Sequence, residues 1–118
     1  MARVVRIAFA TEEDRGLDSI ISSRFGRARY FIIVEYDLDT GSIKGINSIE
    51  GPGTLMRGGA GVKTVQTLVN NNVDIAVAGA FGPNALAALE RMNIRHVELS
   101  GLKISEALDR VIRLADFK

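Results

Sequence analysis

A chain of 118 residues has the length of one domain, and its 47% apolar residues are enough for one hydrophobic core. Fifteen basic and fourteen acidic residues give a formal net charge of +1, which argues against a nucleic-acid-binding protein with a strongly basic face. Cysteine is missing and histidine occurs once, which excludes disulfides, thiolate metal ligands and any site that needs two histidines from one chain. No apolar run approaches the ~18 residues of a membrane span. We therefore expect one domain over residues 1–118, located in the cytoplasm.

The first half of the sequence predicts three strands. Residues 4–10 (VVRIAFA) are mostly apolar on both faces, as expected of a buried central strand. Residues 28–37 form a second apolar run, and the turn signal DLDTG separates it from residues 42–50. The rough alternation of apolar and polar residues in 42–50 indicates a half-buried strand. The second and third strands therefore predict an antiparallel hairpin.

The second half alternates helices and strands after a glycine-rich loop at 51–61. Apolar periodicity predicts a helix at 62–70, a strand at 74–79, a helix at 85–92 with Pro83 in its first turn, a strand at 94–99 and a helix at 103–114. The order is βββαβαβα, and strand–helix–strand units are parallel crossovers. We expect an α/β fold with a five-stranded mixed sheet flanked by helices.

Positive charge is concentrated in the stretch ISSRFGRARYF at the entrance to the second strand. Arg24, Arg27 and Arg29 lie within six residues of one another around Gly26, which permits a sharp turn. An unpaired buried guanidinium costs several kcal/mol, so these side chains are either solvated or paired. The apolar Phe25 is expected in the core. The candidate acidic partners on the preceding loop are Glu12, Glu13, Asp14 and Asp18.

The glycine-rich loop delivers the start of a helix. It does not match a Walker loop, because Val62 precedes Lys63 where that pattern requires glycine. Gly59 and Gly61 still allow a ligand to approach the backbone, and a helix N-terminus is receptive to anions. Arg57 and Lys63 add positive charge nearby. The alternative is a surface loop whose glycines only permit tight turns.

A second glycine turn, AGAFGPN, joins a strand to a helix. In open α/β sheets, turns at the carboxyl ends of strands line the ligand crevice. Gly79 and Gly82 are therefore candidate ligand-binding positions. The alternative is a plain tight connection between the strand and the helix.

Residues with catalytic chemistry do not assemble into a site in the sequence. Glu12, Glu13 and Asp14 are adjacent and indicate a solvated acidic loop. His96 lies inside a predicted strand, where a structural role is favoured. Ser22 has no histidine nearby to act as its base. The residues by themselves imply no reaction.

The stretch ISSRFGRARYFIIVE resembles the signature Ser-x-x-Phe-Gly-Arg-Ala-x-Tyr-Phe of the dinitrogenase iron–molybdenum cofactor biosynthesis family. This family comprises small NifX-like and NifY-like domains, which also occur at the C-terminus of NifB. The stretch GVKTVQTLVNNNVDIAVAGAFGPNALAALERMNIRHVEL is similar to the second half of that family's domain, so the resemblance covers about residues 4–114. It implies a ribonuclease H-like fold. It also implies binding, carriage or storage of iron–molybdenum cofactor, its precursors or related metal–sulfur clusters.

The sequence departs from the family at two histidine positions. Many members have histidine directly before the Phe-Gly pair, where Arg24 stands here, and another in the loop before the first long helix, where this chain has none. The expected binding mode is therefore electrostatic and backbone capture of an anionic cluster, molybdate or another oxyanion. The expected cofactor-binding residues are Arg24, Phe25, Gly26, Arg27, Arg57, Gly59, Gly61, Lys63, Gly79 and Gly82.

The resemblance and the residues together predict a non-enzymatic carrier or accessory protein for an anionic metal–sulfur cofactor. Its expected partners are the anionic cluster or oxyanion and a metallocluster-assembly protein or apo-enzyme, without nucleic acid or membrane. We expect a monomer or a weak homodimer. One alternative is a cofactor-free regulatory or protein-interaction module. A ribonuclease H-like metal-dependent enzyme is disfavoured, because the first and fourth strands end in FAT and VAG, which contain no carboxylate.

Overall fold

The computed structural model describes residues 3–115. Its elements are β1 (Val4–Thr11), the one-turn 3-10 helix η1 (Gly16–Asp18), β2 (Tyr30–Asp37), β3 (Ser42–Glu50), α1 (Ala60–Asn70), β4 (Ile75–Ala78), α2 (Pro83–Arg91), β5 (Arg95–Glu98) and α3 (Ile104–Leu114). Apart from η1, which lies in an expected loop, the predicted order βββαβαβα is confirmed. Among the described residues no helix is long and apolar enough to span a membrane.

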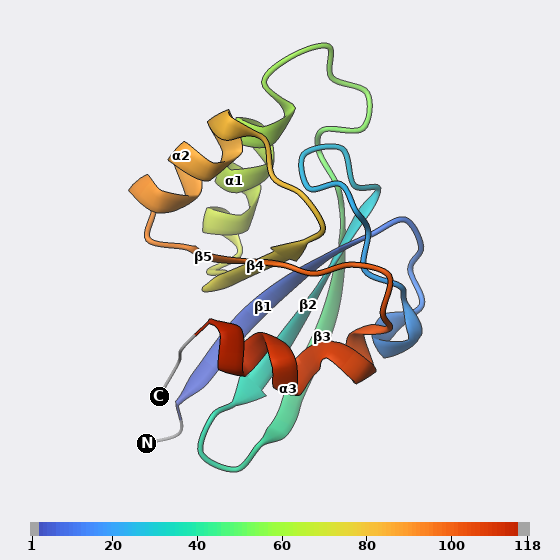
Figure 1. Cartoon of the computed structure of the whole chain (residues 1–118), viewed down its shortest axis with the longest axis vertical. Coiled ribbons are helices and arrows are strands. Elements are labelled where there is room, and N and C mark those ends of the chain that lie inside the picture. The colour runs from blue at the N-terminus through green and yellow to red at the C-terminus, as the bar shows by residue number, and fades with distance from the viewer. Residues whose placement is uncertain (1–2, 116–118) are drawn as a thin grey trace.

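The five strands form one mixed sheet in the order β3-β2-β1-β4-β5. β2 pairs antiparallel with both β1 and β3, whereas β4 pairs parallel with both β1 and β5. The helices α1 and α2 lie together on one side of the sheet, and α3 lies on the other (Figure 1). The prediction of an α/β fold with a mixed five-stranded sheet is therefore confirmed.

Each face of the sheet has its own apolar core. Along β1, Val5, Ile7 and Phe9 belong to the core beneath α3. Ala8 and Ala10 alternate with them and belong to the core beneath α1 and α2. Because successive residues of a strand point to opposite faces, a strand buried on both sides needs apolar residues at nearly every position. β1 is thus the central buried strand that its sequence predicts.

The prediction that 42–50 is half-buried is wrong. Seven of the nine residues of β3 are exposed, and only Gly45 and Ile49 are partly covered. The strand lies at the edge of the sheet, and neither core contains Ile43 or Ile46. The register also shifts where Glu35 and Tyr36 of β2 pair with Gly45 and Ile43, so Lys44 is an extra residue in β3 and the alternation read from the sequence does not continue along the strand.

The two helices that carry the predicted ligand loops begin and end at glycine, proline and asparagine. α1 starts at Ala60, two residues earlier than predicted, after Gly59 adopts a left-handed conformation with φ of 72°. α2 starts at Pro83, as expected from proline in a first turn. Asn72 and Asn93 follow these helices with φ of 57° and 58°, the left-handed geometry that terminates helices. The first turns of α1 and α2 are therefore well defined.

Candidate functional site

A pocket of about 260 Å³ lies where three segments distant in the sequence meet. The segments are the turn before β2, the first turn of α1 and the first turn of α2. The residues that line the pocket are Gly26, Arg27, Ala60, Gly61, Gly82, Pro83, Asn84 and Ala85. We call this hollow the anion pocket, because of the charge and dipoles described below.

Small residues allow the three backbone segments to come this close. A Cβ atom added to Gly26 would lie 3.1 Å from the backbone nitrogen of Gly61. One added to Gly61 would lie 3.0 Å from the Cβ of Ala85, so the N-terminal ends of α1 and α2 are in direct contact. Larger side chains at Gly26 or Gly61 would push the walls of the pocket apart. These two glycines therefore shape the site through packing.

Both helices present their N-termini to the anion pocket without a competing negative charge. The first turns of α1 and α2 contain no acidic residue, and within residues 3–115 no side chain caps the N-terminus of either helix. The amide of Lys63 donates to the carbonyl of Gly59 at 3.0 Å, and that of Leu86 donates to the carbonyl of Gly82 at 3.0 Å. Amides that precede these residues in the helices have no intrahelical acceptor. The site combines such amides with two converging positive dipole ends.

Arg27 provides the guanidinium of the anion pocket and also holds the glycine-rich loop. Its Nη1 donates to the carbonyl oxygens of Gly53, at 3.1 Å, and of Met56. Its Nη2 donates to the carbonyl of Arg57 at 3.4 Å. The sequence suggested acidic partners for this arginine, whereas the structure gives it loop carbonyls. The loop carbonyls are within reach of Arg27 because Gly53 packs directly against the turn at Gly26. A Cβ atom added to Gly53 would lie 2.0 Å from the carbonyl oxygen of Gly26.

Arg24 and Phe25, which lie directly before Gly26 and Arg27 in what we call the FGR turn (Phe25–Arg27), point elsewhere. Nη2 of Arg24 lies 2.8 Å from Oε1 of Glu12, which confirms one of the predicted acidic partners. Arg24 lines a different hollow, on the side of the β1–β2 connection. Phe25 is 2% exposed, and its ring packs on Phe31 and Phe81 with centroid distances of 5.6 and 4.8 Å. Phe25 is therefore a core residue that supports the turn from beneath.

The structure brings four of the ten predicted residues together in the lining of the anion pocket: Gly26, Arg27, Gly61 and Gly82. The other six lie outside that lining, namely Arg24, Phe25, Arg57, Gly59, Lys63 and Gly79. At Gly79 an added Cβ would lie 2.8 Å from Cα of Ser23, so this glycine serves close packing. Arg57 and Lys63 are exposed. At Gly82 an added Cβ would meet nothing within 4 Å, so this glycine is open to the pocket.

Sequence reasoning missed Ala60, Pro83, Asn84 and Ala85 as lining residues. Asn84 is exposed and is the only one of the four with a polar side chain. The sequence did contain a signal for these positions. Pro83 marked the start of a helix, and the residues of a first turn lie next to any anion that binds at the helix N-terminus.

The histidine and the carboxylates do not form a metal centre in the part of the chain that the structure describes. Within residues 3–115, no three histidine, aspartate or glutamate side chains lie close enough together to hold a metal ion. His96 is exposed on β5, and its ring packs edge-on against Phe81 with a centroid distance of 5.2 Å. Its contact is with an aromatic ring, in keeping with the structural role that its sequence position favours.

Comparison with known proteins relates this architecture to one family. Residues 3–114 match the family described as dinitrogenase iron-molybdenum cofactor. The apo form of the orange protein from Desulfovibrio gigas is a similar solved structure, with a TM-score of 0.80, 27% identity, and coverage of 98% of this chain and 92% of that one. A putative NifB protein from Thermotoga is also similar, with a TM-score of 0.72, 30% identity and coverage of 97% of each chain. The search of curated proteins gives no match. Because the family match spans nearly the whole sequence, this chain belongs to the dinitrogenase iron-molybdenum cofactor family.

Proposed function

We propose that this protein binds and carries an anionic metal–sulfur cofactor, either iron–molybdenum cofactor, one of its precursors or a related cluster, and catalyses no reaction on it. The observation that carries the proposal is the anion pocket. There the N-termini of α1 and α2 converge beside Arg27, and the lining residues include no carboxylate. Family membership supports the class of cargo, and the similar orange protein structure is described as an apo form.

The chemistry of the pocket suits capture of a preassembled anion. Backbone amides and a guanidinium donate hydrogen bonds to sulfide or oxo groups, and the helix dipoles favour negative charge. No thiolate is available, because the sequence contains no cysteine. In this proposal the cargo is therefore held without a covalent bond from the protein to a metal, and it can be handed on intact. Molybdate and other oxyanions would meet the same donors.

The fold supports the same assignment. The order β3-β2-β1-β4-β5 with an antiparallel β2 supports the ribonuclease H-like topology that the family resemblance implies. A metal-dependent nuclease would need carboxylates that converge on a divalent ion. In the described residues 3–115 no such group of side chains is found. We therefore propose a carrier or accessory role, as a monomer or weak homodimer that meets a metallocluster-assembly protein or an apo-enzyme.

Titration with tetrathiomolybdate, a dianion, tests this function. Under anaerobic conditions at low salt, the protein should bind it, and binding should weaken as salt screens the charges. Asn84→Asp places a negative charge in the lining of the pocket without changing the size of the side chain. We expect affinity to fall about tenfold, because a carboxylate a few ångströms from a dianion costs about 1 kcal/mol or more for each unit charge. Calorimetry or the visible spectrum of the ligand measures the change.

Asn47→Asp is the matched control, since Asn47 is an exposed residue of β3 and the substitution changes the net charge equally. Its affinity for tetrathiomolybdate should equal that of the unmodified protein. Asn84→Asp should also keep its thermal stability, because an aspartate in the first turn of a helix is favourable. The proposal fails if the unmodified protein does not bind the dianion, or if the two variants lose affinity equally.

A further inference from the structure

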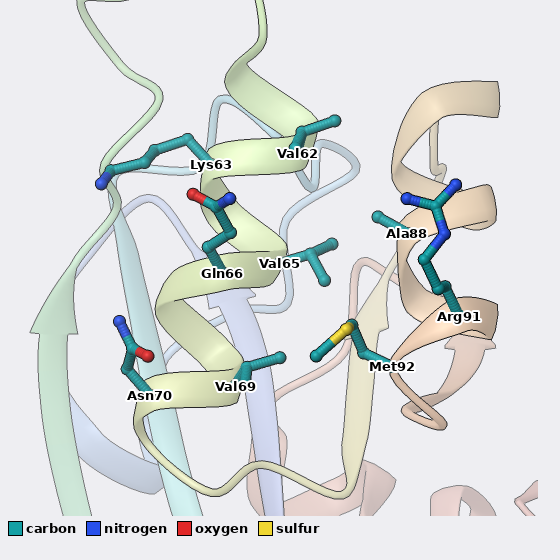
Figure 2. Close-up of a pocket in the computed structure, with 9 residues that line it drawn as sticks. All are labelled: Val62, Lys63, Val65, Gln66, Val69, Asn70, Ala88, Arg91 and Met92. Atoms are coloured by element: carbon teal, nitrogen blue, oxygen red, sulfur yellow. The ribbon is translucent and has the colours of Figure 1, made fainter.

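A groove of about 360 Å³ runs between the outer sides of α1 and α2, and five of its nine lining residues are apolar. Val62, Val65 and Val69 of α1 face Ala88 and Met92 across it (Figure 2). We call this feature the helix groove. It is separate from the anion pocket in its lining residues, and the proposed function does not use it.

The helix groove has exposed apolar side chains on its walls and a floor that belongs to the core beneath α1 and α2. Val65 forms the floor and is 1% exposed, whereas Val62 and Met92 on the walls are 41% and 46% exposed. The valines occur at spacings of three and four residues, so they form one apolar stripe along two turns of α1. A stripe of this kind between two helices is the surface on which an amphipathic helix docks, with side chains at positions i, i+3 or i+4 and i+7.

The polar residues of the groove are neutral or positive. Lys63 and Arg91 lie on opposite sides of it, and no carboxylate belongs to its lining (Figure 2). Among residues 3–115, the ion pairs involve neither Lys63 nor Arg91. An occupant that carries acidic residues on both sides of an apolar stripe would match this arrangement of charge.

We propose that the helix groove docks an acidic amphipathic helix of a partner protein. A second copy of this chain is a poorer occupant, because four apolar residues of α3, the helix outside the groove, are already buried against the sheet, namely Ile104, Ala107, Leu108 and Val111. The groove adjoins the anion pocket through the contact of Gly61 with Ala85 at the N-terminal ends of the same helices. A partner seated there would lie beside the cargo. The identity of that partner as a donor or recipient of the cluster rests on the proposed function, whereas the docking itself does not.

The probe is a synthetic helical peptide with leucines spaced three and four residues apart and glutamates at the other positions. Its control has lysines in place of the glutamates. We expect fluorescence anisotropy at low salt to show about fivefold tighter binding of the glutamate peptide, as expected of a few exposed ion pairs. Lys63→Glu combined with Arg91→Glu should reverse this preference. Equal affinity for the two peptides, or no binding of either, would overturn the proposal.

Two apolar positions of equal exposure provide a second test. Met92→Glu places a carboxylate in the groove, and we expect it to weaken binding of the glutamate peptide about tenfold through lost apolar contact and repulsion. Ile46→Glu changes a residue of β3 that is 47% exposed, against 46% for Met92, and should leave binding unchanged. The assignment is wrong if both variants lose binding equally. It is also wrong if the protein forms a concentration-dependent dimer that Met92→Glu abolishes, since the groove would then bind a second copy.

The docking proposal and the proposed function are tested separately. Met92→Glu is titrated with tetrathiomolybdate, and the unmodified protein is titrated with both tetrathiomolybdate and the glutamate peptide. Normal binding of the dianion with no peptide bound by the unmodified protein rejects only the groove. Peptide binding without dianion binding rejects only the cargo site.

Discussion

At the scale of single residues, Arg27 has a structural role and a proposed role in binding. A guanidinium has five N–H donors in a planar fork. Three hydrogen bonds join Arg27 to the carbonyls of Gly53, Met56 and Arg57, so they hold the glycine-rich loop against the turn before β2. These bonds use three of the five donors, and in the proposed function the remaining two, on Nε and Nη2, would donate to the anion. The same side chain therefore positions the loop and, in that proposal, also binds the cargo.

We predict that Arg27→Gln loosens the glycine-rich loop. The substitution leaves loop carbonyls without their charged donor, at a cost of about 1–3 kcal/mol in the free energy of unfolding. Hydrogen exchange in residues 53–59 should become faster, and chemical unfolding should show the lost stability. Arg57→Gln is the control, because the Arg57 side chain is exposed and its backbone carbonyl is kept. Equal protection of the loop in both variants would contradict the role assigned to Arg27.

At the scale of elements, the β2–β3 hairpin depends on one buried carboxylate. Asp37 ends β2 and is 3% exposed. Its Oδ1 accepts hydrogen bonds from the backbone amides of Asp39 at 2.9 Å and Thr40 at 3.3 Å, and Oδ2 lies 4.0 Å from Nζ of Lys44. The bond from Asp39 is the main cause that lowers the pKa of Asp37, and burial opposes it. The turn is therefore stabilised by the ionised form of Asp37.

The lowered pKa makes the stability of the hairpin depend on pH. A carboxyl whose pKa is lower in the folded chain stabilises that chain above the ordinary pKa of 3.8, and its contribution disappears as the pH falls through the folded value. Thermal unfolding between pH 6 and pH 2.5 should therefore show a falling Tm below about pH 4. In Asp37→Asn the fall should be shallower, because the amide oxygen still accepts hydrogen bonds but does not titrate. An identical acid profile in the two proteins would exclude Asp37 as a source of the pH dependence.

At the scale of the whole molecule, the sheet couples the two cores. α1 and α2 pack on one face and α3 on the other, and β1 contributes buried residues to both cores. The anion pocket and the helix groove lie on the side of α1 and α2, so their geometry depends on a sheet that α3 supports from behind. The side of the molecule that carries both proposed sites is thus stabilised by packing on both faces of the sheet.

Truncation of either core should destabilise the whole fold. Leu68→Ala, on α1, and Ile104→Ala, on α3, each remove a side chain that is 0% exposed. Each should cost about 2–5 kcal/mol through lost apolar contact and a residual cavity. Urea unfolding followed by circular dichroism and by hydrogen exchange should keep a single transition at a lower midpoint. Leu114→Ala, at a position that is 58% exposed, should change the midpoint little. Separate transitions for the two faces would show that the cores are independent.

The sequence by itself determined the elements of this protein, because their signals are local. Apolar periodicity, the DLDTG turn, Pro83 and the asparagine runs predicted the order of strands and helices to within about two residues at most ends. The edge position of β3 was not predictable in this way, since alternation along a strand does not say whether a helix covers it. The arginines around Gly26 and the two glycine-rich loops predicted an anion site, which stays a prediction, and the shortage of histidine argued only against direct metal ligation.

Only the tertiary structure decided which loops line a common pocket. Gly26, Gly61 and Gly82 are separated by tens of residues in sequence and meet because α1 and α2 pack together at their N-terminal ends above the FGR turn. The same packing gave Arg27 its carbonyl partners and directed Arg24 toward Glu12. Residue spacing along the chain carries no information about such tertiary contacts, because they depend on how separate elements bury their apolar faces against one sheet.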